Sequence, residues 1–417
     1  MLMHSLSAGG FKARQLSLFD HVADTYARAP GHVVSNDVLY KTTSRLSGVS
    51  MDEFNHREPI GESGEAHSVI KRSIRWHQQT LKKMGLLERA DRGSWQLTDK
   101  GKSKLTKIEP SVAMLGFSTH QGIAILGTCA RVFGSSDEPI TLCVTSPPFL
   151  LRNPRDYGNL QDEQEYVDFI LRSIEPIVRN LVPGGSICIN VGNDIFIKGS
   201  PERSMYCERL LLALHDQLGL KLMDRLVWES NKPPGPIAWA SKQRVQLNVA
   251  YEHVYWMTND PSKVRSDNRR VLQEHTKEHL KLIKGGGDQR NASYSDGAYT
   301  LRAGKSFANE TPGKIPRNIL KISSTCADKR GLAKIATSLG LPIHGATMPI
   351  ELPRFLIKFL TGDGEDELVV DPFGGWFRTA KAAEELGRRW MSCDNVREYV
   401  RGGAEGFRGM PGFRMAL

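Results

Sequence analysis

The sequence predicts an α/β protein whose main part is a doubly wound, largely parallel sheet, preceded by a smaller helical domain. From about residue 118 onward, short apolar runs alternate with helical segments, which is the pattern of a parallel sheet covered by helices on both faces. The chain has 417 residues, of which 40% are hydrophobic. A single core seldom serves more than about 250 to 300 residues. We therefore expect at least two domains.

Residues 15–108 are predicted to form the smaller domain. Apolar residues recur at helical spacing near its start, Ser35 is placed to cap a second helix, and a third helix is expected over 68–84. This third helix ends at Gly85 and is followed by a hairpin that turns at 91–93. One face of the third helix is apolar, through Ile70, Ile74, His77, Leu81 and Met84. The other face is mostly basic, through Lys71, Arg72, Arg75, Lys82 and Lys83.

The hairpin carries the pattern G-x-W-x-L-T-x-K-G at residues 93–101. Helices followed by this hairpin resemble the winged-helix domain at the N-terminus of Mrr-type restriction proteins. Winged helices commonly place such a helix in the major groove of DNA, so we expect the basic face to contact DNA. The alternative is that the domain mediates dimerisation or packs on the rest of the chain, with its basic face solvated.

Six apolar runs predict the strands of the larger domain: 123–126, 140–144, 186–191, 226–228, 367–370 and 390–393. Residues 230–345 interrupt this pattern and are rich in Pro, Gly and Asn. Of the total charge of +10, residues 201–345 carry +9 and residues 1–110 carry +5, so the remainder of the chain is mildly acidic. This distribution favours a polyanionic partner such as DNA and predicts that 230–345 is an inserted target recognition region.

The first motif with chemical meaning follows the predicted strand 140–144. It reads Thr145-Ser146-Pro147-Pro148-Phe149. Two consecutive prolines fix the backbone and remove two amide donors, so the loop presents acceptors in a rigid arrangement. Acceptors beside an aromatic ring suit a planar base that bears an exocyclic amino group. We expect the Ser146 hydroxyl and the Pro147 carbonyl to accept the hydrogens of the amine while Phe149 stacks on the ring.

The second motif follows the predicted strand 367–370 and reads Asp371-Pro372-Phe373-Gly374-Gly375. Glycines between a strand and a helix let a ligand approach the backbone, and the next strand ends about 20 residues later at Asp394, where a carboxylate suits ribose hydroxyls. This layout predicts a ligand that contains adenosine. Taken alone, the glycine turn favours a purely structural turn.

Together the two loops resemble the DNA amino-methyltransferases of the β class, in which the catalytic motif precedes the cofactor motif. The resemblance covers residues 118–402 and extends to PvuII-type N4-cytosine modification methyltransferases. Further matching pieces lie at 157–159, 196–199, 236–242, 304–307, 315–318, His344 and Pro349. The resemblance implies a Rossmann-like methyltransferase sheet, S-adenosylmethionine as cofactor, double-stranded DNA as partner and a companion restriction endonuclease.

The resemblance also implies roles for individual residues. Ser146, Pro147, Pro148 and Phe149 would form the catalytic loop. The cofactor would be bound by Asp371, Phe373, Gly374, Gly375, Thr379, Asp394 and Thr128. The target base would leave the stack, and its amine would attack the sulfonium methyl group directly, without a covalent enzyme intermediate. Serine before the two prolines favours the cytosine amine as the target, and the adenine amine stays open as an alternative.

Two positions depart from the family pattern. Where the cofactor loop usually continues with small residues, this chain has Trp376-Phe377-Arg378, and where the first strand is usually followed by Gly-Asp it has Gly127-Thr128. A cation beside a sulfonium is unfavourable, and bulky rings fill space that a cofactor needs. These departures favour an alternative hypothesis, a cofactor-deficient DNA-binding protein on the same scaffold. The other possibility is that Trp376 turns outward and Thr128 still accepts a hydrogen bond.

Several classes of function are not expected. The six cysteines form no CxxC pair and no zinc-ligand pattern with histidine, which predicts reduced thiols, a cytoplasmic protein and no metal site. No window approaches 18 unbroken apolar residues, and residues 1–11 lack a signal-peptide core. We therefore expect neither a membrane protein nor a secreted one.

Overall fold

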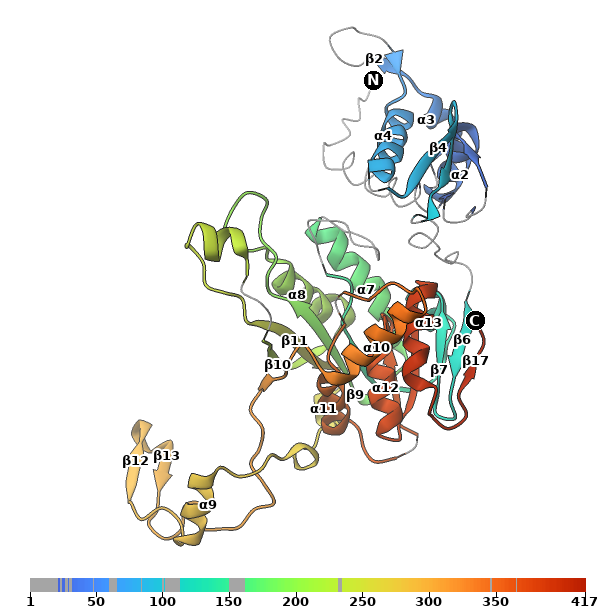
Figure 1. The fold of residues 1–417 in the computed structure, drawn as a ribbon. Coiled ribbons are helices and arrows are strands. Elements are labelled where there is room, and N and C mark those ends of the chain that lie inside the picture. The colour runs from blue at the N-terminus through green and yellow to red at the C-terminus, as the bar shows by residue number, and fades with distance from the viewer. Residues whose placement is uncertain are drawn as a thin grey trace.

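A ten-stranded mixed sheet forms the centre of the computed structural model (Figure 1). The structure describes residues 22, 25–26, 29, 32–47, 49–59, 66–83, 85–99, 101, 113–149, 162–231, 235–345, 347–364 and 366–417. The predicted opening helix and the motif at 157–159 fall mostly or wholly outside these residues.

The sheet has the strand order β14-β10-β11-β9-β8-β15-β16-β7-β6-β17. Along the chain its strands are β6 (Met114–Ser118), β7 (Gly122–Leu126), β8 (Ile140–Thr145), β9 (Leu181–Gly192), β10 (Lys221–Glu229), β11 (Tyr251–Thr258), β14 (Ile319–Lys321), β15 (Leu368–Asp371), β16 (Arg389–Asp394) and β17 (Arg414–Met415). The five central strands, from β9 to β7, are mutually parallel. All six predicted strands are present.

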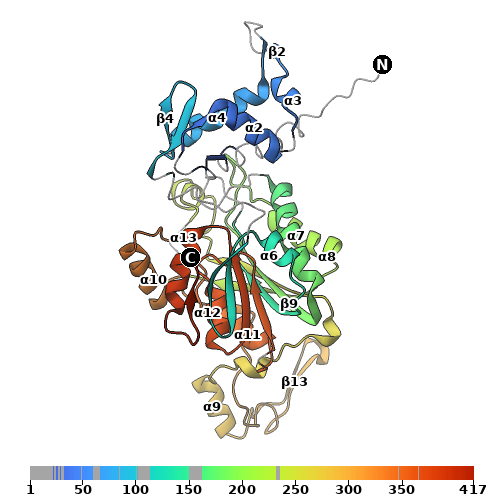
Figure 2. The same cartoon turned by 90° about the vertical axis from the view of Figure 1, so that its right-hand side faces the viewer.

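Helices cover both faces of the sheet, which confirms the doubly wound α/β class (Figure 2). On one face α6 (Cys129–Gly134), α7 (Glu163–Arg179) and α8 (Tyr206–Leu218) pack on the sheet in one apolar cluster. On the other face α11 (Glu351–Leu360), α12 (Arg378–Glu385) and α13 (Arg397–Ala404) pack in a second cluster. α10 (Ala327–Ser338) lies against α13. The short turn η5 (Glu405–Phe407) follows α13.

The sequence did not predict the antiparallel part of the sheet. β11 lies between β9 and β10 and runs antiparallel to both. It falls inside the predicted recognition region 230–345, so that region is not one continuous insertion. Because Glu252 pairs with Gly192 and Thr258 with Ser186, β11 begins at the carboxyl edge of the parallel strands and ends at their amino edge. The helical turn η1 (Ile237–Lys242) precedes β11, and the turns η2 (Pro261–Lys263) and η3 (Asn268–Val271) follow it.

A small lobe, residues 273–314, continues from the amino edge (Figure 1). It contains α9 (Lys277–Lys284) and a hairpin of β12 (Ala292–Tyr294) and β13 (Tyr299–Leu301), joined by η4 (Ser295–Gly297). Two backbone hydrogen bonds close its neck: Gln273 N donates to Lys314 O at 2.9 Å and Lys314 N donates to Gln273 O at 2.8 Å. The chain therefore enters and leaves the lobe at adjacent positions.

The N-terminal domain has the predicted helices and hairpin. Its elements are β1 (Val34–Ser35), α2 (Asn36–Ser47), α3 (Met51–Asn55), β2 (Glu58–Pro59), β3 (Ala66–His67), α4 (Val69–Lys83), β4 (Leu87–Asp91) and β5 (Ser94–Leu97). Ser35 Oγ accepts a hydrogen bond from Val38 N at 3.3 Å, as its capping role predicts. On α4, Ile74, His77 and Leu81 face the core of the domain. β1, β4 and β5 form a three-stranded sheet.

All six cysteines have free thiols. Across the described ranges, no three His, Cys, Asp or Glu side chains gather in a group suited to a metal ion. No helix in this part of the chain combines the length and apolar character that a membrane crossing requires.

Candidate active site

The two motifs lie side by side at the carboxyl edge of the sheet. β8 and β15 are parallel neighbours, with Cys143 opposite Val370, so the loops that follow them leave the sheet together. Two side chains tie the loops to each other. Thr145 Oγ1 donates to Asp371 Oδ1 at 2.6 Å, and Thr379 Oγ1 donates to the carbonyl of Val144 at 3.1 Å. Residues more than 200 positions apart in sequence therefore form one edge.

Ser146 is held by an asparagine that the sequence analysis did not select. The Ser146 hydroxyl donates to Asn190 Oδ1 at 3.1 Å, and Asn190 Nδ2 donates to the carbonyl of His253 at 3.2 Å. The second bond fixes which end of the amide faces the serine. Because the hydroxyl hydrogen is engaged, the lone pairs of Ser146 Oγ stay available as acceptors. Asn190 is 2% exposed, and an amide within the apolar run 187–191 was the signal that could have revealed it.

The remaining residues of the catalytic loop pack tightly against β9. Pro147 is buried, and Pro148 and Phe149 are half-buried. A Cβ atom at Gly192 would lie 3.3 Å from the ring of Phe149. Glycine at that position therefore lets the ring lie against the end of β9. The ring of Phe149 therefore lies at the carboxyl edge, where ligands of open α/β sheets bind.

Asp371 is a buried link between the loops. Its Oδ1 accepts from Thr145 and from Phe373 N, the latter at 3.0 Å. Burial raises the pKa of Asp371 from 3.8 to about 6, and the hydrogen bonds from Thr145, Phe373 N and Thr379 offset part of that rise. The ring of Phe373 packs against Phe169, with ring centroids 5.6 Å apart. Asp371 and Phe373 thus fix the start of the glycine loop through a hydrogen bond and through packing against α7.

Asp394 stands at the end of β16, where the sequence predicts a group for ribose hydroxyls. Its Oδ2 accepts from Gly375 N at 2.8 Å and its Oδ1 accepts from Val396 N at 2.8 Å. Gly374 N donates to the carbonyl of Cys393 at 2.8 Å. The glycine loop therefore folds back onto the end of β16.

Thr128 lies at the end of β7, the neighbour of β16. Its side chain caps α6 by accepting from Arg131 N at 3.4 Å. Gly127 N donates to the carbonyl of Asp394 at 3.0 Å, which brings Thr128 close to the end of β16. The threonine hydroxyl is thus committed to the helix as an acceptor, and its own hydrogen remains a donor.

The two aromatic residues that depart from the family pattern are buried in apolar clusters. Phe377 packs edge-on to Phe117 in the core beneath the sheet, with ring centroids 5.2 Å apart. Trp376 packs with Leu332, Val396 and Tyr399, between α10 and α13. Neither ring turns out to solvent, since both residues are at most 2% exposed. The expected alternative in which Trp376 points outward is therefore wrong.

Comparison with known proteins gives a family for this arrangement. A family model described as DNA methylase matches residues 140–405. The type II methyltransferase M.PvuII of Proteus hauseri is 33% identical over 290 residues, which cover 69% of this chain and 84% of the relative.

The chain belongs to the DNA methylase family.

Structure and further relatives agree with this membership. The solved PvuII DNA methyltransferase, described as cytosine-N4-specific, is 30% identical with a TM-score of 0.53, over 70% of this chain and 87% of that one. The type II methyltransferase M.BglII of Bacillus subtilis is 24% identical over 63% of this chain and 62% of the relative. The resemblance expected from the sequence is confirmed, and S-adenosylmethionine is the cofactor of this family.

The residues of the glycine loop fit that cofactor. Arg378, which follows the loop and begins α12, has a buried Nε with no hydrogen-bond acceptor among the described residues. Buried donors nearly always have partners, so this arginine has unused capacity for an acceptor. Gly375, with φ of 52°, is approached so closely by His344 that a Cβ there would lie 2.9 Å from His344 Nε2. The glycine is thus required by the fold of the loop.

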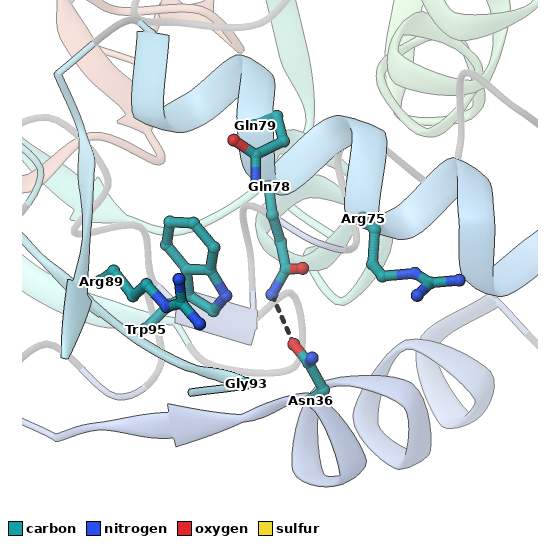
Figure 3. Close-up of a pocket in the computed structure, with 7 residues that line it drawn as sticks. All are labelled: Asn36, Arg75, Gln78, Gln79, Arg89, Gly93 and Trp95. Atoms are coloured by element: carbon teal, nitrogen blue, oxygen red, sulfur yellow. Dashed lines mark hydrogen bonds between the residues drawn. The ribbon is translucent and has the colours of Figure 1, made fainter. Parts of the chain in front are cut away.

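The N-terminal domain matches a family model described as the Mrr N-terminal domain, over residues 25–107. Between α4 and the hairpin β4–β5 it has a hollow of about 370 Å³ (Figure 3). Arg75 and Gln79 of α4 line one side, and Arg89 of the hairpin lines the other. Gln78 Nε2 donates to Asn36 Oδ1 at 3.0 Å and to Tyr26 Oη at 2.7 Å. A rigid polar floor between two cations is a surface suited to a nucleic-acid backbone.

Proposed function

We propose that this protein transfers a methyl group from S-adenosylmethionine to the N4 amine of cytosine within a short DNA sequence. The observation that carries the proposal is the hydroxyl of Ser146, which Asn190 holds as an acceptor at the carboxyl edge. The glycine loop for the cofactor lies on the adjacent strand. The relatives M.PvuII and the cytosine-N4-specific PvuII enzyme support this target.

The catalytic loop acts by positioning. A base in a duplex must leave the stack to reach Ser146, and Phe149 supplies a face on which it stacks. The lone pairs of Ser146 Oγ accept an N–H of the amine and become more favourable partners as positive charge develops on that nitrogen. When bound, S-adenosylmethionine supplies the electrophilic methyl group. The methylated nitrogen then releases its proton to solvent, because a neutral serine hydroxyl whose hydrogen is bonded to Asn190 is too weak a base to take it up.

Methylation of a ring carbon through a cysteine is not supported. That chemistry needs an accessible thiolate. Cys143 lies within β8 and is fully buried, and burial raises the pKa of its thiol well above the usual value. The site therefore favours direct transfer to an exocyclic amine.

Incubation with radiolabelled S-adenosylmethionine and mixed-sequence duplex DNA tests the proposal. We expect label in the DNA, and digestion to nucleosides is expected to show N4-methylcytosine. Label in N6-methyladenine would show that the target is adenine and not cytosine, and the protein would still be a DNA amino-methyltransferase. Folded protein that binds DNA and gives no label, and that gives no heat of binding with S-adenosylmethionine, would support the cofactor-deficient hypothesis instead.

We further propose that the N-terminal domain is a second DNA contact and that the enzyme protects DNA from a companion endonuclease. Arg72, Arg75, Gln79 and Lys82 lie along one exposed stripe of α4, and Arg89 faces that stripe across the hollow. Phosphate contacts by cations make DNA affinity depend on salt.

Replacing both Arg75 and Arg89 with alanine tests this contact. The variant is expected to lower the slope of log affinity against log salt by about 2, since each phosphate contact contributes about 0.9. Arg45→Ala, at an exposed site on α2 away from the hollow, serves as the control and should leave the slope unchanged. Equal slopes for all three proteins would leave DNA binding to the larger domain alone.

A further inference from the structure

Arg378, the first residue of α12, has a buried guanidinium that the fold does not fully use. The residue is 3% exposed, and its Nε has no hydrogen-bond acceptor among the described residues. It forms an ion pair with Asp328 at the start of α10. A guanidinium has five N–H donors, so a single carboxylate leaves several of them without a partner. An arginine buried in this state has a large capacity for a further anion.

The surroundings of Arg378 carry more positive than negative charge. Lys329, the neighbour of Asp328, donates from Nζ to the carbonyl of Thr347 at 3.3 Å. Burial lowers the pKa of Lys329, Cys326 opposes this, and the charge of Arg378 lowers the pKa further. The charges of Lys329 and Arg378 therefore repel each other, and the carboxylate that pairs with Arg378 is that of Asp328. Its side chain is 46% exposed, so it is the partner that most readily turns to solvent.

The backbone at this point also favours an anion. α12 begins after Phe377, whose φ of 56° places it in the left-handed region and which provides no side-chain cap. The first N–H groups of a helix have no intrahelical acceptor, and the helix dipole places partial positive charge there. The N-terminus of α12 directly follows the glycine loop Gly374–Gly375 at the carboxyl edge of β15. Anionic groups of ligands bind at such helix starts in α/β folds.

We propose that Arg378 binds the α-carboxylate of the methionine moiety of S-adenosylmethionine. This inference rests on the proposed function and names one contact of its cofactor. The carboxylate is the anionic group of that molecule, whereas its amino group and sulfonium are cations that Arg378 repels. A carboxylate partner also answers the objection that a cation stands near the sulfonium, because the arginine pairs with the opposite end of the amino acid. Asp328 neutralises Arg378 until the cofactor carboxylate takes its place.

Calorimetric titration of the full-length chain with two ligands tests the contact. S-adenosylmethionine and decarboxylated S-adenosylmethionine share the adenosine, the sulfonium and the methyl group, and differ in the carboxylate. We expect the wild-type protein to bind S-adenosylmethionine at least about tenfold more tightly, as a charge-assisted hydrogen bond in a buried site provides. Arg378→Ala should lose this preference by weakening S-adenosylmethionine alone, with the decarboxylated ligand bound within about twofold of wild type.

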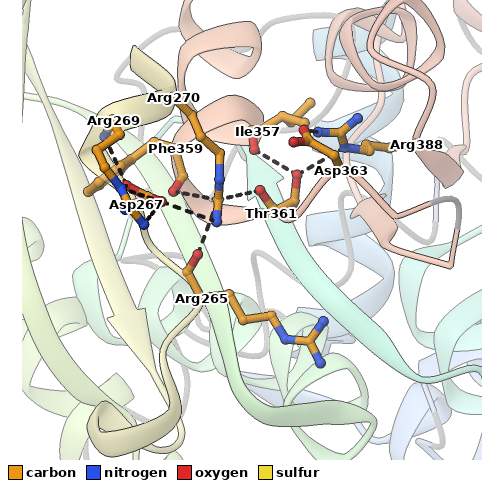
Figure 4. A network of polar contacts seen from close by, with 9 residues as sticks. All are labelled: Arg265, Asp267, Arg269, Arg270, Ile357, Phe359, Thr361, Asp363 and Arg388. Atoms are coloured by element: carbon orange, nitrogen blue, oxygen red, sulfur yellow. Dashed lines mark hydrogen bonds and ion pairs between the residues drawn. The ribbon is translucent and has the colours of Figure 1, made fainter. Parts of the chain in front are cut away.

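Arg388 offers a matched control. It is a buried arginine at the opposite end of the same part of the sheet, where Thr361 and Asp363 accept its hydrogen bonds (Figure 4). Arg388→Ala should keep the preference for S-adenosylmethionine. Asp328→Asn removes the competing carboxylate and should strengthen S-adenosylmethionine binding by a few fold, without effect on the decarboxylated ligand. If Arg378→Ala does not fold, the affinities of the wild-type protein and of Asp328→Asn for the two ligands still test the contact.

Two results would overturn the assignment. One is equal affinity of the wild-type protein for both ligands, and the other is an unchanged preference in folded Arg378→Ala. Failure of the proposed function has a different signature, because the wild-type protein would then bind neither ligand.

Discussion

Two buried arginines lie at opposite ends of the β15–β16 pair, and the protein treats them differently. Arg388, just before β16, is 7% exposed; its Nε donates to Thr361 Oγ1 at 3.2 Å and its Nη2 to Asp363 Oδ1 at 2.9 Å. Its Nη1 donates to the carbonyl of Leu386. Arg378, just after the cofactor loop, is buried equally well and keeps an Nε without an acceptor. The arginine at the amino edge thus has acceptors for its N–H groups, whereas the arginine at the carboxyl edge has a buried N–H without one.

Both edges hold further polar groups. At the amino edge Arg270 donates to the carbonyls of Arg265 and Phe359, at 3.2 and 3.4 Å (Figure 4). There the polar groups join the end of α11 to the segment that leads into the lobe. At the carboxyl edge the lone pairs of Ser146 Oγ stay available, and Arg378 Nε has no acceptor among the described residues. In an open α/β sheet the ligand binds at the carboxyl edge. The unpartnered donor of Arg378 lies at that edge, whereas, within the described ranges, the buried atoms without a partner at the amino edge, Gln121 Oε1 and Glu367 Oε2, are acceptors.

The largest expected effect comes from removing the acceptor at the carboxyl edge. Ser146→Ala should lower methyl transfer by about 100-fold or more, because an oriented partner for the reacting nitrogen is lost. DNA affinity and S-adenosylmethionine affinity should stay within about twofold of wild type. Initial rates with labelled cofactor measure the effect, and Ser262→Ala, in a turn at the amino edge, is the control. A rate within threefold of wild type would remove Ser146 from the mechanism.

Next in size is the pH dependence contributed by Asp371. Its folded pKa of about 6 lies above the unfolded value of 3.8, so its contribution to stability is fully present below pH 3.8 and is lost as pH rises toward 6. Asp371→Asn has no such ionisation and still offers an oxygen to Thr145. Urea unfolding measures this effect. Between pH 4 and pH 7 the free energy of unfolding of the variant should rise by up to about 3 kcal/mol relative to that of the wild-type protein. A difference that does not change with pH would mean that Asp371 is ionised without cost.

Removal of the satisfied arginine should cost more stability than removal of the unsatisfied one. Arg388→Ala breaks three hydrogen bonds and should lower the free energy of unfolding by about 2 kcal/mol more than Arg378→Ala. Tryptophan fluorescence during urea unfolding measures both variants. An equal cost would show that Arg378 is as fully used as Arg388, and the contrast between the edges would then disappear.

The smallest effect is expected at Asn190, which acts on the target through Ser146. Asn190→Ala should lower the maximal rate about tenfold and leave the KM for S-adenosylmethionine unchanged, because the serine hydroxyl loses its fixed orientation. Asn190→Asp restores an acceptor for that hydroxyl but loses the donor to the His253 carbonyl, so it should recover part of the rate. If Asp behaves like Ala, the role of Asn190 is packing beside β11 instead of orientation of Ser146.

The sequence predicted what depends on local pattern. Apolar runs located the six strands, the Ser35 cap and the periodicity of α4 located the N-terminal helices, and the motifs at Ser146 and Asp371 located the carboxyl edge. The family followed from the same motifs.

Features that depend on the partner of a strand were not predictable in this way. The direction of β11 follows from its pairing with β9, and its apolar pattern is the same in either direction. The role of Asn190 depends on the carbonyl of His253 more than 60 residues away. The burial of Trp376 depends on α10 and α13, so the side chain that looked like an obstacle to the cofactor is part of a core.

The neck of the lobe affects which sequence changes the fold tolerates during evolution. Residues 273 and 314 are hydrogen-bonded to each other, so the chain enters and leaves the lobe at one point. Insertions or replacements between such points are tolerated because the ends already meet and little loop-closure entropy changes. The lobe can therefore vary in length and composition while β11, β14 and the two catalytic loops keep their positions. Sequence changes in the lobe are thereby separated from the residues of the carboxyl edge.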